Sequence, residues 1–311
     1  MSSFLIRVLL AFFAASLAGC TMPEPAKLRA YVPPTQQERV VYVGNANTQA
    51  VDVQRQSEEL IRANYNIKRK QVQQNSYALI IGIANYQHAT PVVYADYSAY
   101  AFKELATNTL GVPAENVLML VNETATSGQI KSKVELLKEL ADKGSKVYVY
   151  YAGHGVPGKD GNSYLLPADM SADAIHLEPN LMLDSIYQRL AQGQASNVYV
   201  FVDSCFSGKD DRGELLYKGV APLLRVASAK PVAKNLTVVT AGGASDFAND
   251  LEEKKQRMFT YYLIKALEGG VTRIDSVFPQ VQSQVKRASL MKGIGYKQVP
   301  ELAGNTNASL Y

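Results

Sequence analysis

The sequence has few of the side chains on which several kinds of functional site depend. Its 311 residues include two cysteines, three histidines and no tryptophan. The two cysteines, Cys20 and Cys205, exclude a disulfide framework, and the histidines show no zinc-ligand spacing. No glycine-rich phosphate loop is present, so nucleotide use is not expected. The formal net charge is +4, with basic and acidic residues mixed along the chain, which argues against nucleic-acid binding.

The N-terminal segment has the pattern of a secreted lipoprotein. Arg7 precedes the apolar residues 8–18, which are too few to span a bilayer comfortably but suit a signal peptide. Small residues then lead to Cys20, as in the lipobox of bacterial lipoproteins. This resemblance implies removal of residues 1–19 and acylation of the Cys20 thiol; a plain transmembrane anchor is the alternative. Because Thr21 rather than an aspartate follows, the sorting pattern of Gram-negative lipoproteins favours the outer membrane, with the protein facing the periplasm.

Composition divides the rest of the chain into three parts. Hydrophobic residues make up 47% of the sequence, which supports a folded core. Residues 20–75 contain several prolines and are rich in Gln, Asn and Arg, so we expect a spacer that tethers the domain to the membrane, with a polar helix over 53–74. A tether is favoured over a binding function for this stretch. Residues 76–303 form the predicted domain, and residues 304–311 form a C-terminal tail.

Strand-like and helix-like segments alternate through the predicted domain. Short apolar runs predict strands at residues 77–83, 117–121, 147–151, 198–202 and 236–241. Apolar residues at helical spacing predict helices over 96–107, 126–141, 183–191, 258–267 and 274–286. This alternation predicts an α/β fold with a mainly parallel sheet.

Two of the predicted strands end in loops that carry reactive side chains. VYVYYAGHG spans residues 147–155 and VYVFVDSCFSG spans residues 198–208. Apolar runs of this length, bounded by turn residues, are typical of strands buried on both faces of a parallel sheet. Catalytic groups in such sheets lie just beyond the carboxyl ends of the strands. We therefore expect His154 and Cys205 to face each other, although 51 positions separate them.

A cysteine and a histidine in this arrangement suit nucleophilic catalysis. A thiol attacks as its thiolate, and a neighbouring imidazole can take the thiol proton and later protonate the leaving amine. Glycines beside the histidine allow a substrate to approach the backbone closely. Backbone N–H groups near the nucleophile can stabilise a developing oxyanion.

With these motifs the chain resembles the caspase-like cysteine peptidases of clan CD, family C14, particularly the bacterial metacaspase and orthocaspase branch. YALIIGIANY at residues 77–86 resembles the family's first strand, and YLLPAD at 164–169 resembles the segment after the histidine loop. FTYYLIKAL at 259–267 resembles a helix of the small-subunit region. The resemblance covers about residues 76–300 and implies a caspase-haemoglobinase-like three-layer α/β/α sandwich.

The resemblance also implies roles for individual residues. Cys205 would be the nucleophile and His154 the general acid and base, while the backbone N–H groups of Gly155 and Cys205 would form the oxyanion hole. Asp203, two residues before the nucleophile, and Asp96, early in the first helix of the domain, would line an acidic S1 pocket.

Such a carboxylate pair favours cleavage after Arg or Lys, because a buried cation requires a paired charge. Other interpretations of the acidic residues stay open. Asp203 can also cap a turn, and Asp96 is also favoured at a helix N-terminus by the helix dipole. Asp246 and Asp250 are further candidates for the pocket charge.

Several features depart from the family pattern. Phe206 follows the nucleophile where many metacaspases have a histidine. No cofactor is required by the predicted chemistry, but some metacaspases depend on calcium, which takes six to eight oxygen ligands. Asp169 matches one family calcium position, and three residues lie near others: Asp184, Asp210 and Asp211. The full cluster is not reproduced.

The sequence therefore predicts a monomeric, membrane-tethered cysteine endopeptidase that acts on peptide or protein substrates with a basic P1 residue. The segment after the nucleophile contains basic residues at which autoprocessing can occur, namely Lys209, Lys218 and Arg225. Two other functions stay open. One is a non-catalytic caspase-like scaffold or signalling module at the cell envelope, and the other is a different Cys-His hydrolase or transferase.

Overall fold

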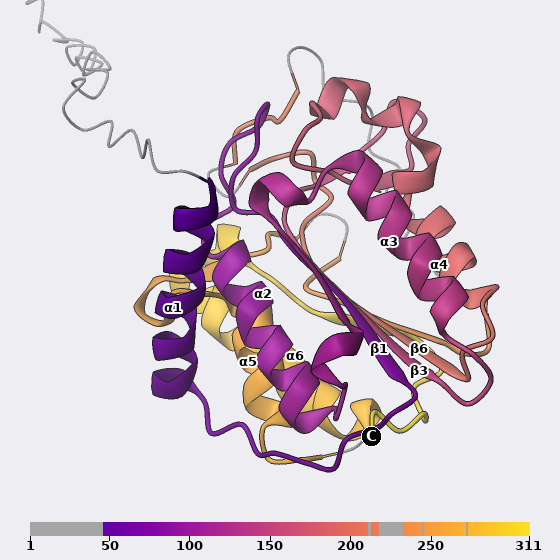
Figure 1. Cartoon of the computed structure of the whole chain (residues 1–311). Coiled ribbons are helices and arrows are strands. Elements are labelled where there is room, and N and C mark those ends of the chain that lie inside the picture. The colour runs from indigo at the N-terminus through magenta and orange to yellow at the C-terminus, as the bar shows by residue number, and fades with distance from the viewer. Residues whose placement is uncertain (1–45, 211–212, 218–232, 244–245, 272) are drawn as a thin grey trace, which may run out of the picture. The chain divides into compact units, whose positions relative to one another are not determined.

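The computed structural model describes residues 46–210, 213–217, 233–243, 246–271 and 273–311 (Figure 1). The predicted signal peptide, Cys20 and the first part of the predicted spacer lie outside these ranges, as do Asp211, Lys218 and Arg225. In the part of the chain that is described, no helix is both long and apolar enough to cross a membrane.

A six-stranded sheet forms the centre of the fold, with the strand order β10-β7-β6-β3-β1-β2. Five parallel strands match the predicted ones to within one or two residues: β1 (Ser76–Gly82), β2 (Val117–Val121), β3 (Lys146–Ala152), β6 (Asn197–Asp203) and β7 (Leu236–Thr240). The sixth, β10 (Glu301–Gly304), pairs antiparallel with β7 at the edge of the sheet and was not predicted. The predicted α/β class with a mainly parallel sheet is confirmed.

The central strands are apolar on both faces because helices cover both sides of the sheet. In β3 and β6, every residue after the first is buried. Side chains of alternate residues enter two separate cores, so Tyr148 and Tyr150 pack on one face of the sheet while Val147 and Val149 pack on the other. A parallel sheet covered in this way needs continuous apolar runs rather than alternating ones.

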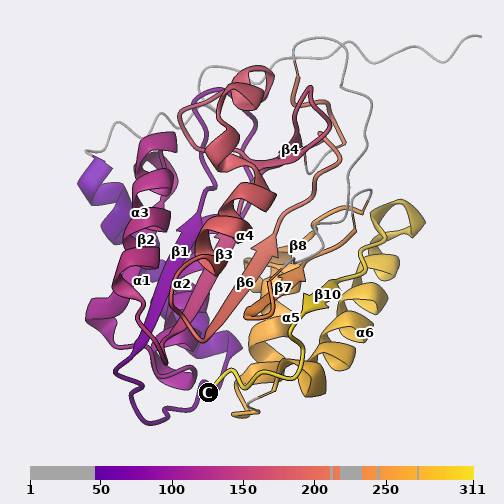
Figure 2. The ribbon, with the colours of Figure 1, turned by 90° about the vertical axis from the view of Figure 1, so that its right-hand side faces the viewer.

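Two helical layers flank the sheet (Figures 1 and 2). One face is covered by α3 (Ser127–Leu140) and α4 (Leu183–Ala191). The other face is covered by α2 (Ala95–Glu104), α5 (Met258–Leu267) and α6 (Ile274–Lys292). This arrangement is the expected three-layer sandwich. Two short antiparallel ribbons lie outside the main sheet, β4 (Gly155–Pro157) with β5 (Ser163–Leu165), and β8 (Asp250–Leu251) with β9 (Gln256–Arg257).

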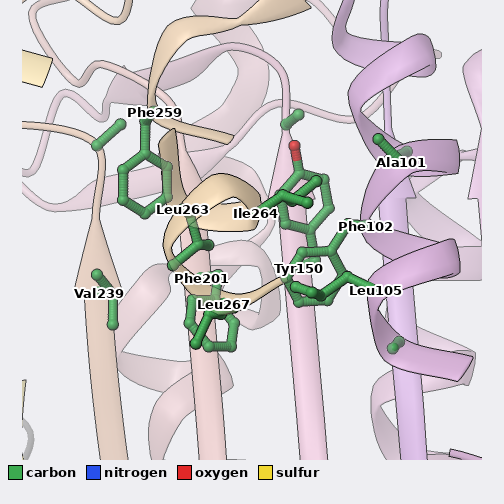
Figure 3. Packing of buried hydrophobic residues seen from close by; sticks show 14 of the residues in the cluster. Ala101, Phe102, Leu105, Tyr150, Phe201, Val239, Phe259, Leu263, Ile264 and Leu267 are labelled. Carbon is green, nitrogen blue, oxygen red and sulfur yellow. The ribbon is translucent and has the colours of Figure 1, made fainter. Parts of the chain in front are cut away.

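The core under α2 and α5 is rich in aromatic side chains (Figure 3). Phe102 of α2 stacks on Tyr150 of β3 with ring centroids 4.4 Å apart, and Phe201 of β6 lies 5.3 Å from Phe102. Leu263 and Leu267 of α5 are fully buried in the same core. Truncation of a buried aromatic side chain of this kind costs about 3–5 kcal/mol of stability. This core fixes the positions of β3 and β6, the two strands that carry the predicted catalytic loops.

Helix α6 is longer than predicted. Its apolar stripe continues at Val277, Val281 and Val285 and then reaches Ser289, which is fully buried although polar. The Ser289 hydroxyl donates to the Lys286 carbonyl and accepts the N–H of Gln298, so the buried oxygen is satisfied. The helix therefore runs on to Lys292.

Residues 46–75, which the sequence analysis placed in the spacer, contribute a helix to the same compact unit, which extends from Asn45 to Tyr311. This helix, α1 (Ala46–Asn64), packs along α2, and Ile61 and Tyr65 are buried there. The helix predicted over 53–74 thus begins seven residues earlier and ends ten residues earlier. The buried apolar stripe of α1 is narrow and the rest of the helix is polar, so the sequence shows only a weak helical pattern of apolar residues.

The predicted tail, residues 304–311, packs against the end of the sheet. Leu310 is fully buried, its carbonyl accepts a hydrogen bond from the Tyr148 hydroxyl, and the Tyr199 hydroxyl donates to the Ser309 carbonyl at 2.7 Å. The two tyrosines come from β3 and β6, so the chain end covers the edge of the sheet opposite the predicted catalytic loops.

Candidate active site

The register of β3 and β6 sets the geometry of the candidate site. These strands are neighbours, and their last paired residues are Ala152 and Asp203. His154 and Cys205 each lie two residues beyond that pair. The two loops therefore leave the sheet at the same edge and at the same level, so the fold brings together two segments that are distant in sequence.

The two loops also contact each other directly. The Ser204 hydroxyl donates to the Gly153 carbonyl at 2.7 Å. A Cβ atom added to Gly155 would lie 2.6 Å from the Cys205 carbonyl oxygen and 2.5 Å from the Phe206 ring. These distances are shorter than any side chain tolerates, so glycine at position 155 is required for the close approach of the histidine loop to Cys205.

The imidazole of His154 is buried and held in one tautomer. Its exposed fraction is 3%, and its Nε2 lies 2.8 Å from the carbonyl oxygen of Thr90. A carbonyl oxygen only accepts hydrogen bonds, so Nε2 must carry the proton. In the neutral ring Nδ1 then holds the lone pair, and the Thr90 carbonyl stabilises the ring further when it becomes charged. A histidine held in this way can act as a base through Nδ1.

Two tyrosines fix the backbone of His154. The Tyr86 hydroxyl accepts the His154 backbone N–H at 2.8 Å, and the Tyr86 ring packs against the imidazole with centroids 4.9 Å apart. The Tyr151 hydroxyl donates to the His154 carbonyl at 2.6 Å. Burial raises the pKa of Tyr151 well above its usual value, so this donor keeps its proton. Neither tyrosine was predicted to belong to the site, although Tyr86 is the last residue of the motif at 77–86.

Cys205 lies beneath the segment that follows it. Its side chain is 8% exposed, and Sγ lies 3.6 Å from the Lys209 carbonyl oxygen and 3.7 Å from the Ser207 hydroxyl. The contact with the Lys209 carbonyl requires a protonated sulfur, because both atoms cannot be acceptors. This contact therefore favours the thiol over the thiolate. Proton transfer to a base would break this contact.

The described residues after the nucleophile, 206–210 and 213–217, contact one another. The Leu216 N–H donates to the Gly208 carbonyl at 3.0 Å, and Lys209 bridges to Leu215. The Tyr217 hydroxyl donates to the Pro157 carbonyl in β4, which ties these residues to the histidine loop. The two loops thus form one connected surface at the carboxyl edge of the sheet.

Asp203 lies at the end of β6 with its carboxylate turned toward α5. The side chain is fully buried, and Oδ2 accepts hydrogen bonds from the Thr260 N–H at 3.0 Å and the Thr260 hydroxyl at 2.6 Å. Thr260 is in the first turn of α5, where a negative charge is favoured by the helix dipole. The other carboxylate oxygen, Oδ1, lies 3.9 Å from Nε of Arg257, which is also buried.

The family model for the caspase domain (Peptidase C14) matches residues 75–311. The chain belongs to the caspase domain family. The predicted membership of the caspase-like peptidase family is confirmed. The assignment to the metacaspase or orthocaspase branch stays a prediction. No curated protein matches the sequence.

Three solved structures show what this chain is similar to in fold. Protein GSU0716 from Geobacter sulfurreducens is similar with a TM-score of 0.53 at 17% identity, covering 75% of this chain and 97% of that one. The structure of pro-sf-caspase-1 gives a TM-score of 0.50 at 16% identity, covering 79% and 93%. Caspase-1 from Spodoptera frugiperda gives 0.48 at 18% identity, covering 76% and 91%. Identities this low show the fold alone.

The caspase-domain fold places the second predicted S1 residue, Asp96, in the first turn of α2. Its carboxylate accepts the Tyr97 N–H at 2.8 Å and the Asn122 amide at 3.2 Å. Burial raises the pKa of the Asp96 carboxyl above its usual value, although these hydrogen bonds oppose the shift. Asp96 and Asp203 thus have different hydrogen-bond partners. Asp96 lies at the N-terminus of a helix, as the alternative interpretation of this residue describes.

The other predicted acidic candidates of this caspase domain have partners from distant parts of the sequence. Asp246 accepts the Val299 N–H at 3.0 Å, and Asp250 pairs with Lys292 at 2.9 Å. Each of them is engaged with the C-terminal part of the chain. Neither contact points to a role in substrate binding.

The predicted calcium ligands that the structure describes also have separate surroundings. Asp169 accepts the Ser127 N–H at the start of α3, Asp184 is exposed in the first turn of α4, and Asp210 accepts the Glu214 N–H at 2.8 Å. Among the residues that the structure describes, no group of three or more His, Cys, Asp or Glu side chains is placed to hold a metal ion. The described aspartates do not fit a calcium site, and calcium dependence stays a prediction.

Proposed function

We propose that this caspase-domain protein is a cysteine endopeptidase in which Cys205 and His154 form the catalytic dyad. Membership of the Peptidase C14 family supports peptidase chemistry. The observation that carries the residue assignment is the register of β3 and β6, in which both residues follow the pair Ala152 and Asp203 by the same two positions. Direct contacts between the two loops keep that juxtaposition in place.

The proposed reaction begins with proton transfer from the Cys205 thiol to Nδ1 of His154. The thiolate attacks the carbonyl carbon of the scissile peptide bond, and the resulting oxyanion receives hydrogen bonds from the backbone N–H groups of Gly155 and Cys205. His154 then gives its proton to the leaving amine as the C–N bond breaks, which leaves a thioester. The Thr90 carbonyl stabilises the charged imidazole during this step.

Hydrolysis of the thioester returns the enzyme to its starting state. His154 takes a proton from water as the water oxygen attacks the thioester carbonyl. The second oxyanion collapses, the C–S bond breaks, and the acid product leaves. The thiolate recovers the proton from His154.

We propose a preference for Arg or Lys at P1, with Asp203 as the main acidic group of the S1 subsite. Along β6, residues two apart lie on the same face, and Phe201 and Cys205 both pack on the face covered by α2 and α5. The Asp203 carboxylate is buried on that face beside α5. A buried carboxylate close to the nucleophile suits a basic P1 side chain. Peptide substrates that differ only at P1 test this preference.

A non-catalytic caspase-like module is the second candidate function. The observation that favours it is the covering of Cys205, whose thiol is buried and hydrogen-bonded to the Lys209 carbonyl. The rate of alkylation by iodoacetamide separates the two candidates. A peptidase dyad predicts alkylation much faster than for a buried structural thiol, with a rate that falls when His154 is replaced by alanine. Slow alkylation that is unaffected by His154→Ala supports the scaffold.

We further propose that the mature protein is attached to the bacterial outer membrane through an acylated Cys20 and acts as a monomer facing the periplasm. The N-terminal lipobox pattern supports this placement. Membrane fractionation of the full chain and its Cys20→Ala variant tests it. The wild-type protein should sediment with the outer membrane, and the variant should lose its lipid. A wild-type protein without lipid contradicts the proposal.

A further inference from the structure

Arg257 is a buried cation at the centre of the proposed S1 region. Its side chain is 1% exposed, although it is the largest fully buried side chain among the residues that the structure describes. A guanidinium is placed in such surroundings only when charged and polar groups surround it. The groups around Arg257 therefore define a site that accepts a guanidinium.

Three segments of the carboxyl edge of the sheet supply those groups. The Asp203 carboxylate, at the end of β6, lies 3.9 Å from Nε. The Val93 carbonyl, just before α2, accepts a hydrogen bond from one terminal nitrogen at 3.4 Å, and the Ala248 carbonyl, after β7, accepts one from the other. One carboxylate and two carbonyls make a binding site of the kind that the P1 side chain of an arginine substrate would require.

The backbone of Arg257 is anchored so that the side chain points into this site. Arg257 ends the ribbon of β8 and β9 and immediately precedes α5. Its N–H donates to the Ser98 hydroxyl of α2 at 2.9 Å, and the Ser98 hydroxyl donates to the Gln256 side chain at 3.1 Å. The ribbon is thus fixed on α2, and Thr260, three residues further on, holds the other oxygen of Asp203.

We propose that Arg257 is an internal ligand of the guanidinium subsite and sets the P1 preference by competing with a basic substrate side chain for Asp203. This inference rests on the proposed peptidase function. While Arg257 is in place, the charge of Asp203 is balanced and its space is filled, so a P1 arginine must displace Arg257 to bind. A substrate with a neutral P1 side chain gains nothing from that displacement. Arg257 therefore weakens the selection for basic P1 residues that Asp203 alone would impose.

Removal of the Arg257 side chain tests whether the vacated space binds a guanidinium. Arg257→Ala opens the site, and Arg257→Gln keeps most of the side-chain length in case the alanine variant does not fold. Thermal unfolding of the full chain is measured against millimolar ethylguanidinium, with ethylammonium as the control cation. We expect saturable stabilisation by ethylguanidinium in the opened variant, and none in the wild type or in Arg257→Ala/Asp203→Asn. A folded variant without saturable stabilisation overturns the proposal.

Peptide cleavage tests the competition itself. The ratio of kcat/KM for a P1 arginine peptide to that for the same peptide with P1 norleucine should rise by about tenfold or more in Arg257→Ala. Arg257→Lys should keep a ratio near the wild-type value. Arg189→Ala in α4, which breaks an ion pair with Glu135 of α3, is the matched control and should also leave the ratio unchanged. A purely structural role for Arg257 predicts equal losses for both peptides, and that result overturns the proposal.

The two measurements separate this inference from the proposed function. Saturable ethylguanidinium binding without cleavage of any peptide by any folded form supports the guanidinium site and contradicts the peptidase assignment. Cleavage that depends on Cys205, together with an unchanged P1 ratio in the Arg257 variants, supports the peptidase and contradicts the inference.

Discussion

Tyr86 holds His154 at two points, because its hydroxyl accepts the His154 backbone N–H at 2.8 Å while its ring lies 4.9 Å from the imidazole. The same hydroxyl is 3.5 Å from that of Tyr151, which holds the His154 carbonyl. The segment after β1 thereby supports the proposed catalytic loop that follows β3. Substitution of Tyr86 should therefore disturb the position of His154.

We predict that Tyr86→Phe lowers kcat more than it changes KM. The ring is kept, but the backbone N–H of His154 loses its acceptor, which costs about 1–3 kcal/mol for a buried polar group. The imidazole should then sample orientations other than the one that its contact with the Thr90 carbonyl holds. Steady-state kinetics and urea unfolding measure the two effects. A fully active variant with unchanged stability contradicts this account of the loop.

Gly155→Ala should lower activity by about 100-fold even though the substitution adds a single methyl group. The added Cβ would lie 2.6 Å from the Cys205 carbonyl oxygen, so the backbone of one loop must move away from the other. A shift of about 1 Å in a catalytic group costs about 100-fold in rate.

Gly128→Ala is the matched control for this experiment. Gly128 lies in the first turn of α3, and nothing lies within 4 Å of the Cβ that alanine would add there. This variant should keep full activity and gain up to about 1 kcal/mol of stability from the higher helix propensity of alanine. Comparable activity of the two variants would show that close contact at Gly155 is not required.

The pKa of Asp96 predicts a pH dependence of stability. Burial raises this pKa above its usual value of 3.8 in the folded chain. The folded protein then binds the proton more tightly than the unfolded chain, so the Asp96 contribution is fully present below pH 3.8 and is lost as the pH rises through the raised pKa. In Asp96→Asn this pH-dependent contribution to the free energy of unfolding is absent. The free energy of unfolding of the variant, relative to wild type, should therefore rise with pH across that window.

Asp275→Asn provides a control of opposite sign. The hydrogen bonds from Arg273 lower the pKa of the partly exposed Asp275 below its usual value. The stabilisation from Asp275 is therefore present above the usual value of 3.8 and is lost as the pH falls through the lowered pKa. Relative to wild type, this variant should lose stability as the pH rises, by a small amount because solvent screens the pair. Equal pH profiles for the two variants contradict the assignment for Asp96.

Much of the central fold could be predicted because burial on both faces of the sheet produces continuous apolar runs. The predicted boundaries of α4 and α5 agree with the structure, and the parallel strands differ by one or two residues at most. Strand β10 was missed because its sequence, ELAG, has only four residues, none of them β-branched or aromatic. The packing of α1 was missed because a stripe of few apolar residues on a polar helix resembles a solvated helix.

The candidate site could be predicted only as far as strand geometry determines it. His154 and Cys205 come together because they follow paired residues of neighbouring parallel strands, and buried runs indicate such strands. The Thr90 carbonyl could not be predicted, since any residue can present a backbone carbonyl and its identity leaves no pattern. The pairing of Asp203 with Arg257 depends on a tertiary contact across 54 positions, and a single charged residue before a helix carries no signal of its partner.

The most direct test of the central claim is hydrolysis of fluorogenic peptides that end in Arg, Lys or Asp, with and without calcium. The purified full chain is compared with Cys205→Ala, which keeps the fold and removes the nucleophile. The account predicts cleavage after Arg or Lys that is lost in the Cys205→Ala variant. Cleavage that persists in that variant, or the absence of cleavage of every peptide by the folded wild-type protein, would contradict it.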